Sequence, residues 1–139
     1  MNKDITIMIV DDALVMRRLM RQYLLDMGFS RIIEAEDGRV AVGKLAEEEP
    51  VDMVISDWLM PNLDGLGFLK VLRSTEAGAS TPFLMVTLLD QREQVLEAVQ
   101  QGVDDYIVKP LDYESFKGKV FRLLEKSGRV PEKTGDMRD

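Results

Sequence analysis

The sequence predicts an α/β domain, built as a doubly wound five-stranded parallel sheet with helices on both faces. Short apolar runs alternate with longer amphipathic stretches, which is the pattern of repeated strand and helix units. Within each run the apolar residues are nearly continuous, as expected for strands that are covered on both faces. The length of 139 residues suits one domain.

Five strands and five helices are expected from this alternation. The strands span residues 5–10, 32–35, 51–56, 83–86 and 105–108. Apolar residues at helical spacing predict four helices between or after them. These residues are Met16, Met20, Tyr23 and Met27 in the first helix, Phe68, Leu69 and Leu72 in the third, Leu96, Val99 and Val103 in the fourth, and Phe116, Val120 and Leu123 in the last. The second helix is expected over residues 39–47.

Glycine and proline mark the ends of several of these elements. Gly28 and Gly102 follow the first and fourth helices, where a left-handed cap residue is favoured, and Pro50 and Pro82 precede strands. Residues 1–126 are expected to form the single domain. Residues 127–139 lose the apolar pattern and are expected to be a flexible tail.

Composition limits the classes of function. The chain has no cysteine and no histidine, so a metal would need oxygen ligands, which suit Mg²⁺, Ca²⁺ or Mn²⁺. A net charge of −7 argues against nucleic acid as a partner. The apolar runs are too short to span a membrane, and the first residues lack the pattern of a signal peptide. We therefore expect a cytoplasmic protein that binds neither nucleic acid nor membrane.

Polar residues follow four of the expected strands. Asp11 and Asp12 come after the first strand, Asp57 after the third, Thr87 after the fourth and Lys109 after the fifth. The carboxyl ends of parallel strands share one edge of a sheet, where sites form in open α/β folds. Three carboxylates and one ammonium group give a charge of −2, which a divalent cation would neutralise.

Each of these residues also has an ordinary structural explanation. Either aspartate of the first pair or Thr87 could cap a helix, Asp57 could be a turn residue before Pro61, and Lys109 could be a solvated surface lysine. Together, however, they supply a nucleophilic oxygen, a metal site and donors to phosphoryl oxygens. Phosphoryl transfer needs little more than these groups.

An ordered set of short motifs makes the pattern specific. These motifs are Val10-Asp11-Asp12, Met16-Arg17-Arg18, Glu34-Ala35-Glu36-Asp37-Gly38, Ile55-Ser56-Asp57-Trp58, Met60-Pro61-Asn62, Asp64-Gly65, Met85-Val86-Thr87 and Val108-Lys109-Pro110. Over roughly residues 5–125 the chain resembles the receiver domains of two-component response regulators, above all stand-alone chemotaxis regulators of the CheY type. The resemblance implies a flavodoxin-like fold with strand order 2-1-3-4-5.

The resemblance also implies roles for the residues at the sheet edge. Asp57 would be the phosphoacceptor, and Mg²⁺ or Mn²⁺ would be bound by Asp12, by Asp57, by Asp11 through water and by the backbone carbonyl of Leu59. Lys109 would pair with a phosphoryl oxygen.

The resemblance implies that two further residues form a switch. In receiver domains a hydroxyl group moves to the phosphoryl group, and an aromatic ring then swings inward. Thr87 and Tyr106 occupy these positions. The Lys109-Pro110 bond is expected to be cis, as in the family. Val95 lies off the expected apolar stripe of its helix and could be an exposed apolar residue beside Tyr106.

The function implied is a signalling switch and not a metabolic enzyme. A histidine kinase would phosphorylate the chain, which would catalyse only its own phosphorylation and dephosphorylation. The surface formed by the fourth helix, fifth strand and fifth helix would then bind a downstream protein target. The chain is expected to be a monomer.

Three leucines depart from the pattern of motor-binding regulators. Leu59 and Leu89 replace polar residues that would flank the attacking water, and Leu88 replaces a small residue. We expect these leucines to control access to the site and to prolong the life of the phosphorylated form.

Two alternative functions use related sites. A phosphohydrolase of the haloacid dehalogenase type needs its nucleophile on the first strand and a second acid two residues later, where this chain has Leu59 after Asp57. A flavodoxin-like binding module needs glycine and hydroxyl residues after the first strand, where this chain has Asp11-Asp12-Ala13.

Overall fold

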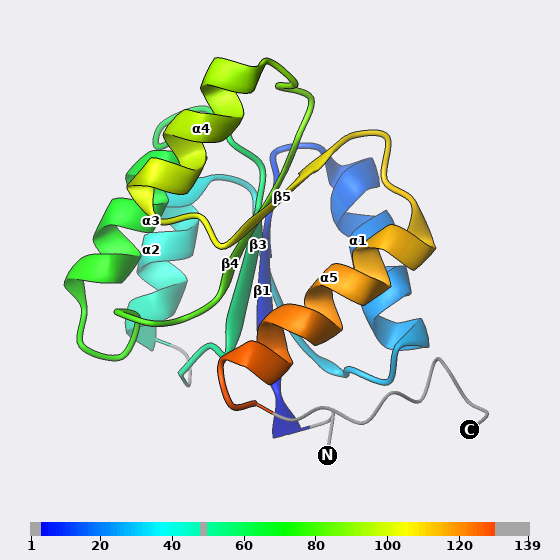
Figure 1. Cartoon of the computed structure of the whole chain (residues 1–139). Helices are drawn as coiled ribbons and strands as arrows, with labels where there is room; N and C mark the ends of the chain where they lie inside the picture. Colours follow the sequence, from blue (N-terminus) through cyan, green and yellow to red (C-terminus); the bar gives the residue numbers. More distant parts are fainter. Residues whose placement is uncertain (1–3, 48–49, 130–139) are drawn as a thin grey trace.

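Within residues 4–47 and 50–129, which this computed structural model describes, five parallel strands form one sheet (Figure 1). The strands are β1 Thr6–Val10, β2 Arg31–Ala35, β3 Met53–Ser56, β4 Phe83–Thr87 and β5 Asp105–Val108. Their order in the sheet is β2-β1-β3-β4-β5. The predicted parallel sheet and its strand order are confirmed.

Helices cover both faces of this sheet. In the described part of the chain they are α1 Leu14–Asp26, α2 Gly38–Glu47, α3 Gly65–Ser74, α4 Arg92–Gln101 and α5 Tyr113–Lys126. Helices α1 and α5 lie together on one face, and α2, α3 and α4 lie on the other (Figure 1). The doubly wound architecture is therefore confirmed.

The central strand β1 shows why the apolar runs are continuous. Ile7 and Ile9 point into the core under α1 and α5, whereas Met8 and Val10 point into the core on the opposite face. All four side chains are fully buried. Because successive side chains of a strand face opposite sides, a strand between two helical layers needs apolar residues at every position.

The predicted cap positions are confirmed, and strand ends differ slightly from the predictions. Gly28 and Gly102 have φ angles of 97° and 111°, the left-handed region that glycine adopts without strain. β3 begins at Met53 instead of residue 51, since the Asp52 side chain accepts the Thr6 backbone N–H at 2.8 Å. β4 extends to Thr87.

The predicted apolar stripe of the fourth helix is wrong at Leu96 and Val99, whereas its third residue, Val103, is buried as predicted. Leu96 and Val99 are 48% and 54% exposed, while Ala98 is fully buried and Val95 is half-buried. The helix carries two adjacent apolar stripes, and the stripe that contains Ala98 packs against the core on this face of the sheet. The larger residues of the other stripe, Leu96 and Val99, lie in solvent. They are therefore the exposed apolar residues of this helix, instead of Val95 as expected.

The start of the expected tail packs against the domain. Arg129 Nε lies 3.2 Å from Asp52 Oδ1, and the Arg129 backbone N–H donates to the Leu124 carbonyl at 2.8 Å. Residues 130–139 of the expected tail lie outside the described residues. No helix in the described part has both the length and the apolar character needed to cross a lipid bilayer.

Candidate functional site

Three carboxylates meet at the carboxyl edge of the sheet. β1 and β3 are neighbours with Val10 paired to Ser56, so the residues that follow these strands lie side by side. The Asp57 backbone N–H donates to the Val10 carbonyl at 2.9 Å and extends this pairing by one residue. Oxygens of Asp11, Asp12 and Asp57 all lie within 4.8 Å of one another. Asp11 and Asp57 are buried, and Asp12 is exposed.

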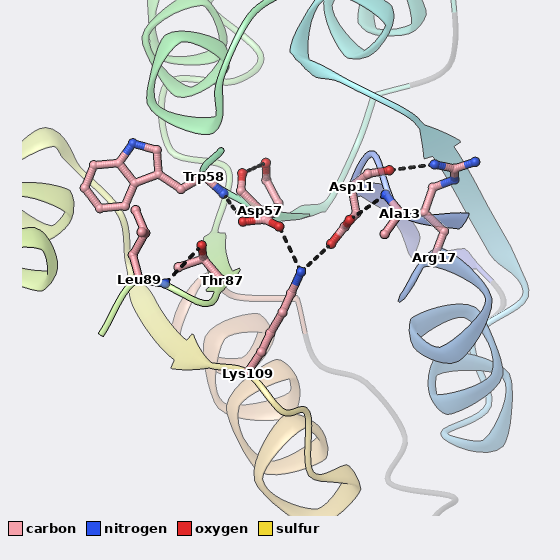
Figure 2. Close-up of polar contacts among 9 residues, drawn as sticks. Asp11, Ala13, Arg17, Asp57, Trp58, Thr87, Leu89 and Lys109 are labelled. Carbon is pink, nitrogen blue, oxygen red and sulfur yellow. Dashed lines mark hydrogen bonds and ion pairs between the residues drawn. The ribbon is translucent and has the colours of Figure 1, made fainter. Parts of the chain in front are cut away.

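Lys109 lies between two of these acids, as Figure 2 shows. Its Nζ is 2.8 Å from Asp57 Oδ2 and 3.0 Å from Asp11 Oδ2. The residue follows β5, and its long side chain spans the end of β4 to reach the acids. The Lys109-Pro110 bond is cis, as expected.

The site has less positive charge than is needed to neutralise its three carboxylates. Burial alone would lower the pKa of Lys109, but hydrogen bonds to Asp57 and Asp11 outweigh burial and raise it. Burial raises the pKa of Asp11, and the Asp57 charge adds to this against the hydrogen bonds from Ala13 and Lys109. The Lys109 ammonium group therefore stays protonated, but its single charge does not neutralise all three carboxylates.

The donor set fits a small divalent cation. Carboxylate oxygens are the ligands that Mg²⁺ prefers, and three of them converge here while a single lysine neutralises one charge. The remaining charge of −2 matches that of a divalent ion.

Backbone contacts hold both buried acids in place. Asp57 Oδ1 accepts the Trp58 N–H at 2.6 Å, and Asp11 Oδ1 accepts the Ala13 N–H at 2.9 Å (Figure 2). Arg17 of α1 donates from Nη1 to the Asp11 carbonyl at 2.6 Å and forms an ion pair with Glu34 of β2 at 3.3 Å. Arg17 belongs to one of the sequence motifs, but the sequence predicts no role for it, because only the fold brings its side chain to the Asp11 carbonyl.

Thr87 and Tyr106 both form hydrogen bonds with the backbone of Leu89. The Tyr106 hydroxyl donates to the Leu89 carbonyl at 2.7 Å, and Thr87 Oγ1 accepts the Leu89 N–H over 3.5 Å. Tyr106 lies on β5 opposite Met85 of β4. Burial raises the pKa of Tyr106, and the charges of Asp57 and Asp90 add to the effect.

The three leucines differ in exposure. Leu59 is 58% exposed and Leu88 is 72% exposed, so both present apolar surface to solvent. Leu89 is half-buried and packs against the core beneath α2, α3 and α4, which also contains Trp58.

Comparisons with known proteins agree with this geometry. A family model for the response regulator receiver domain matches residues 7–121. Chemotaxis protein CheY-3 of Vibrio cholerae is 40% identical over 126 residues, covering 91% of this chain and 96% of that protein.

Solved structures of similar proteins extend the likeness to three dimensions. The chemotaxis response regulator CheY4 of Vibrio cholerae matches with a TM-score of 0.79 and 32% identity, covering 86% of this chain and 98% of that one. The CheX-CheY-BeF3-Mg²⁺ complex of Borrelia burgdorferi matches with a TM-score of 0.80 and 28% identity, covering 86% and 89%. These similarities argue against the phosphohydrolase and the flavodoxin-like binding module as alternatives.

Proposed function

The chain belongs to the response regulator receiver domain family, the signalling switches of two-component phosphorelays, and we propose that Asp57 is its phosphoacceptor. Its similarity to the chemotaxis protein CheY-3 supports a role in chemotaxis-type signalling. The carboxylates of Asp57 and Asp11 are each oriented by Lys109 and by a backbone N–H, whereas Asp12 is exposed. One observation supports Asp57 above Asp11: Asp57 is 8% exposed and Asp11 is fully buried, so Asp57 is the oriented acid that an incoming phosphoryl group can reach.

The proposed metal is Mg²⁺, with Mn²⁺ as a substitute. Asp12, Asp57 and the Leu59 carbonyl would bind it directly, and Asp11 would bind it through water. When bound, the ion would neutralise charge on the phosphoryl oxygens and orient them.

The chain's own residues perform the transfer. A carboxylate oxygen of Asp57 attacks the phosphorus of a kinase phosphohistidine, the new O–P bond forms, and the P–N bond breaks. The imidazole leaves with the bonding electrons. Lys109 moves from its carboxylate partners to a phosphoryl oxygen, where its firmly held charge stabilises the transferred group. Water later attacks the phosphorus, the O–P bond to Asp57 breaks, inorganic phosphate leaves and the carboxylate is restored.

The proposed switch runs through the backbone of Leu89. Thr87 Oγ1 has only a long 3.5 Å contact in the described structure, so it can turn toward a phosphoryl oxygen at little cost. That movement would shift the β4 to α4 loop, to which the Tyr106 hydroxyl is bonded. The effect would reach the surface of α4, β5 and α5, where Leu96, Val99 and Val108 are exposed.

A histidine kinase and a downstream target protein are the partners that receiver-domain membership implies. We propose that the target binds the α4, β5 and α5 surface of a cytoplasmic, monomeric chain. Capture of the target should depend on beryllofluoride, which mimics the acyl phosphate, and sedimentation should give the mass of one chain. Equal capture with and without beryllofluoride would contradict the proposed switch.

The acceptor is tested by labelling with acetyl phosphate in Mg²⁺. Asp57→Asn should abolish labelling, because the amide is not a nucleophile under these conditions. Asp26→Asn, which removes the same charge from an exposed position on α1, should be labelled like the wild type. Labelling of Asp57→Asn at a comparable rate would disprove the assignment.

A further inference from the structure

Few hydrogen bonds hold the loop from β3 to α3 near the proposed metal site, although Met60 packs against the core on this face of the sheet. Its ends are fixed, since the Gly65 N–H donates to the Trp58 carbonyl at 2.7 Å and the Gly38 N–H donates to the Leu63 carbonyl at 3.0 Å. Between these points lie residues 59–62, which include the carbonyl proposed as a metal ligand. In the ranges 4–47 and 50–129, one side-chain hydrogen bond joins this segment to another element.

That bond comes from Asn62. Its Nδ2 donates to Asp37 Oδ2 at 2.7 Å, and its backbone has a φ angle of 72°. This left-handed conformation is uncommon outside glycine, and asparagine and aspartate tolerate it better than most other residues. The residue type at position 62 thus serves both the bend of the loop and the side-chain bond.

The partner, Asp37, is a buried acid outside the three-carboxylate cluster. Its side chain lies at the start of α2, where Oδ1 accepts the Val40 N–H at 2.9 Å while Oδ2 accepts from Asn62. The residue is 3% exposed. The hydrogen bond from Val40, followed by that from Asn62, lowers the pKa of Asp37, so it remains a carboxylate and a full-strength acceptor.

The loop and α2 also touch through their backbones. A Cβ atom at Gly38 would lie 2.5 Å from the Leu63 carbonyl oxygen, so only glycine permits this approach. The start of α2 is therefore joined to the loop twice, once by the Gly38 backbone and once by the Asp37 side chain.

We propose that Asp37 and Asn62 form a clamp that positions residues 59–62 for Mg²⁺ without touching the ion. This inference rests on the proposed metal site, in which the Leu59 carbonyl is a ligand. Mg²⁺ demands nearly ideal octahedral geometry, so a carbonyl on a loosely held loop would bind it poorly. Groups that orient a metal ligand without contacting the metal commonly control metal affinity in this way.

A charge-swap series tests the clamp. Asn62→Asp retains a residue that tolerates the left-handed backbone but places a second carboxylate against Asp37, so the bond is lost. In the double variant D37N/N62D the amide at position 37 donates to the carboxylate at position 62, and its oxygen still caps α2. The double variant has the same net charge as the wild type.

Mg²⁺ affinity is measured by Trp58 fluorescence and by calorimetry on the full chain. N62D should bind Mg²⁺ about 5-fold more weakly, as expected for the loss of one orienting hydrogen bond, and D37N/N62D should recover to within about 2-fold of the wild type. An added negative charge alone would tighten Mg²⁺ binding, so weaker binding by N62D cannot be an effect of charge. N62G, which keeps the backbone conformation without the amide, should also bind more weakly.

Stability without Mg²⁺ separates positioning from a purely structural role. If the variants lose stability in urea but keep wild-type Mg²⁺ affinity, the bond only supports α2 and the clamp is disproved. Failure of D37N/N62D to recover affinity would also disprove it, and N62G decides the matter if N62D does not fold. If the wild type itself binds no Mg²⁺, the proposed metal site fails and the clamp fails with it.

Discussion

Replacing Asp12 by Asn is expected to stabilise the Mg²⁺-free protein, although the residue is a proposed metal ligand. Asp12 is the exposed member of the three-carboxylate cluster, and the structure pairs Lys109 with the other two acids instead. Without a cation, Asp12 therefore contributes mainly repulsion.

The magnitude follows from the geometry of the cluster. Oxygens of the three acids lie within 4.8 Å of one another. At that separation, two unit charges interact by about 0.9 kcal/mol in water and by about 3.5 kcal/mol at an effective dielectric constant of about 20. Asp12→Asn removes two repulsions and one attraction to Lys109, which leaves a net gain of about one pair interaction. Because Asp12 is exposed, the lower figure applies, and we expect about 1 kcal/mol.

Mg²⁺ should reverse the order of stability. Binding stabilises the wild type by RT ln(1 + [Mg²⁺]/Kd), whereas Asp12→Asn should gain much less. A difference of about 1 kcal/mol is offset when the Mg²⁺ concentration reaches about four times the wild-type Kd. Above that concentration the wild type should be the more stable protein.

Urea unfolding over a series of Mg²⁺ concentrations measures both effects, and Asp26→Asn controls for the change in net charge. The two unfolding free energies should cross once as Mg²⁺ rises. If Asp12→Asn were less stable than the wild type without Mg²⁺, the repulsion argument would be wrong. If Mg²⁺ stabilised both proteins equally, Asp12 would not be a ligand.

Three further predictions concern phosphoryl lifetime, the tail and acid stability. Phosphorylated Asp57 should be long-lived because Leu59 and Leu89 cannot hydrogen-bond the attacking water, and L59N/L89E should release phosphate about 10- to 100-fold faster; equal rates would refute this. Removing residues 130–139 should leave the urea midpoint unchanged, and a large loss on truncation would show that the segment stabilises the fold. Arg129→Ala should lower the free energy of unfolding by at most about 1 kcal/mol, since the ion pair of Arg129 is partly exposed. Burial alone would raise the pKa of Asp105, but hydrogen bonds from a backbone N–H and two α5 cations lower it. The stability that the Asp105 carboxylate gives to the fold should be fully present when the pH is above the ordinary aspartate pKa of 3.8. It should disappear as the pH falls through the lower pKa of Asp105 in the folded protein. Asp105→Asn should flatten this acid loss of stability in urea titrations between about pH 5 and 2; an unchanged pH profile would show that other acids cause it.

The positions of the site residues were predictable because strand ends of a parallel sheet share an edge. Asp11, Asp57 and Lys109 lie together as the sequence indicated, although 98 positions separate the first from the last. Their roles in phosphoryl transfer came from the resemblance to receiver domains, and these roles stay predictions.

The face of α4 could not be predicted. Its sequence carries two apolar stripes that differ by one position, and periodicity alone cannot decide which of them packs. In the folded protein the stripe with Ala98 is buried, and Leu96 and Val99 are exposed.

The sequence by itself determined the alternation of strands and helices, their caps and the residues at the strand ends, because these depend on local spacing and backbone preference. Only the tertiary structure decided the contacts that join separate loops. The bond between Asp37 and Asn62 crosses 25 positions, and the one from Arg17 ends on the Asp11 backbone carbonyl. A polar side chain in a loop has many possible partners in the unfolded chain. Its partner is fixed only when the packing of the whole chain brings one donor and one acceptor within hydrogen-bonding distance.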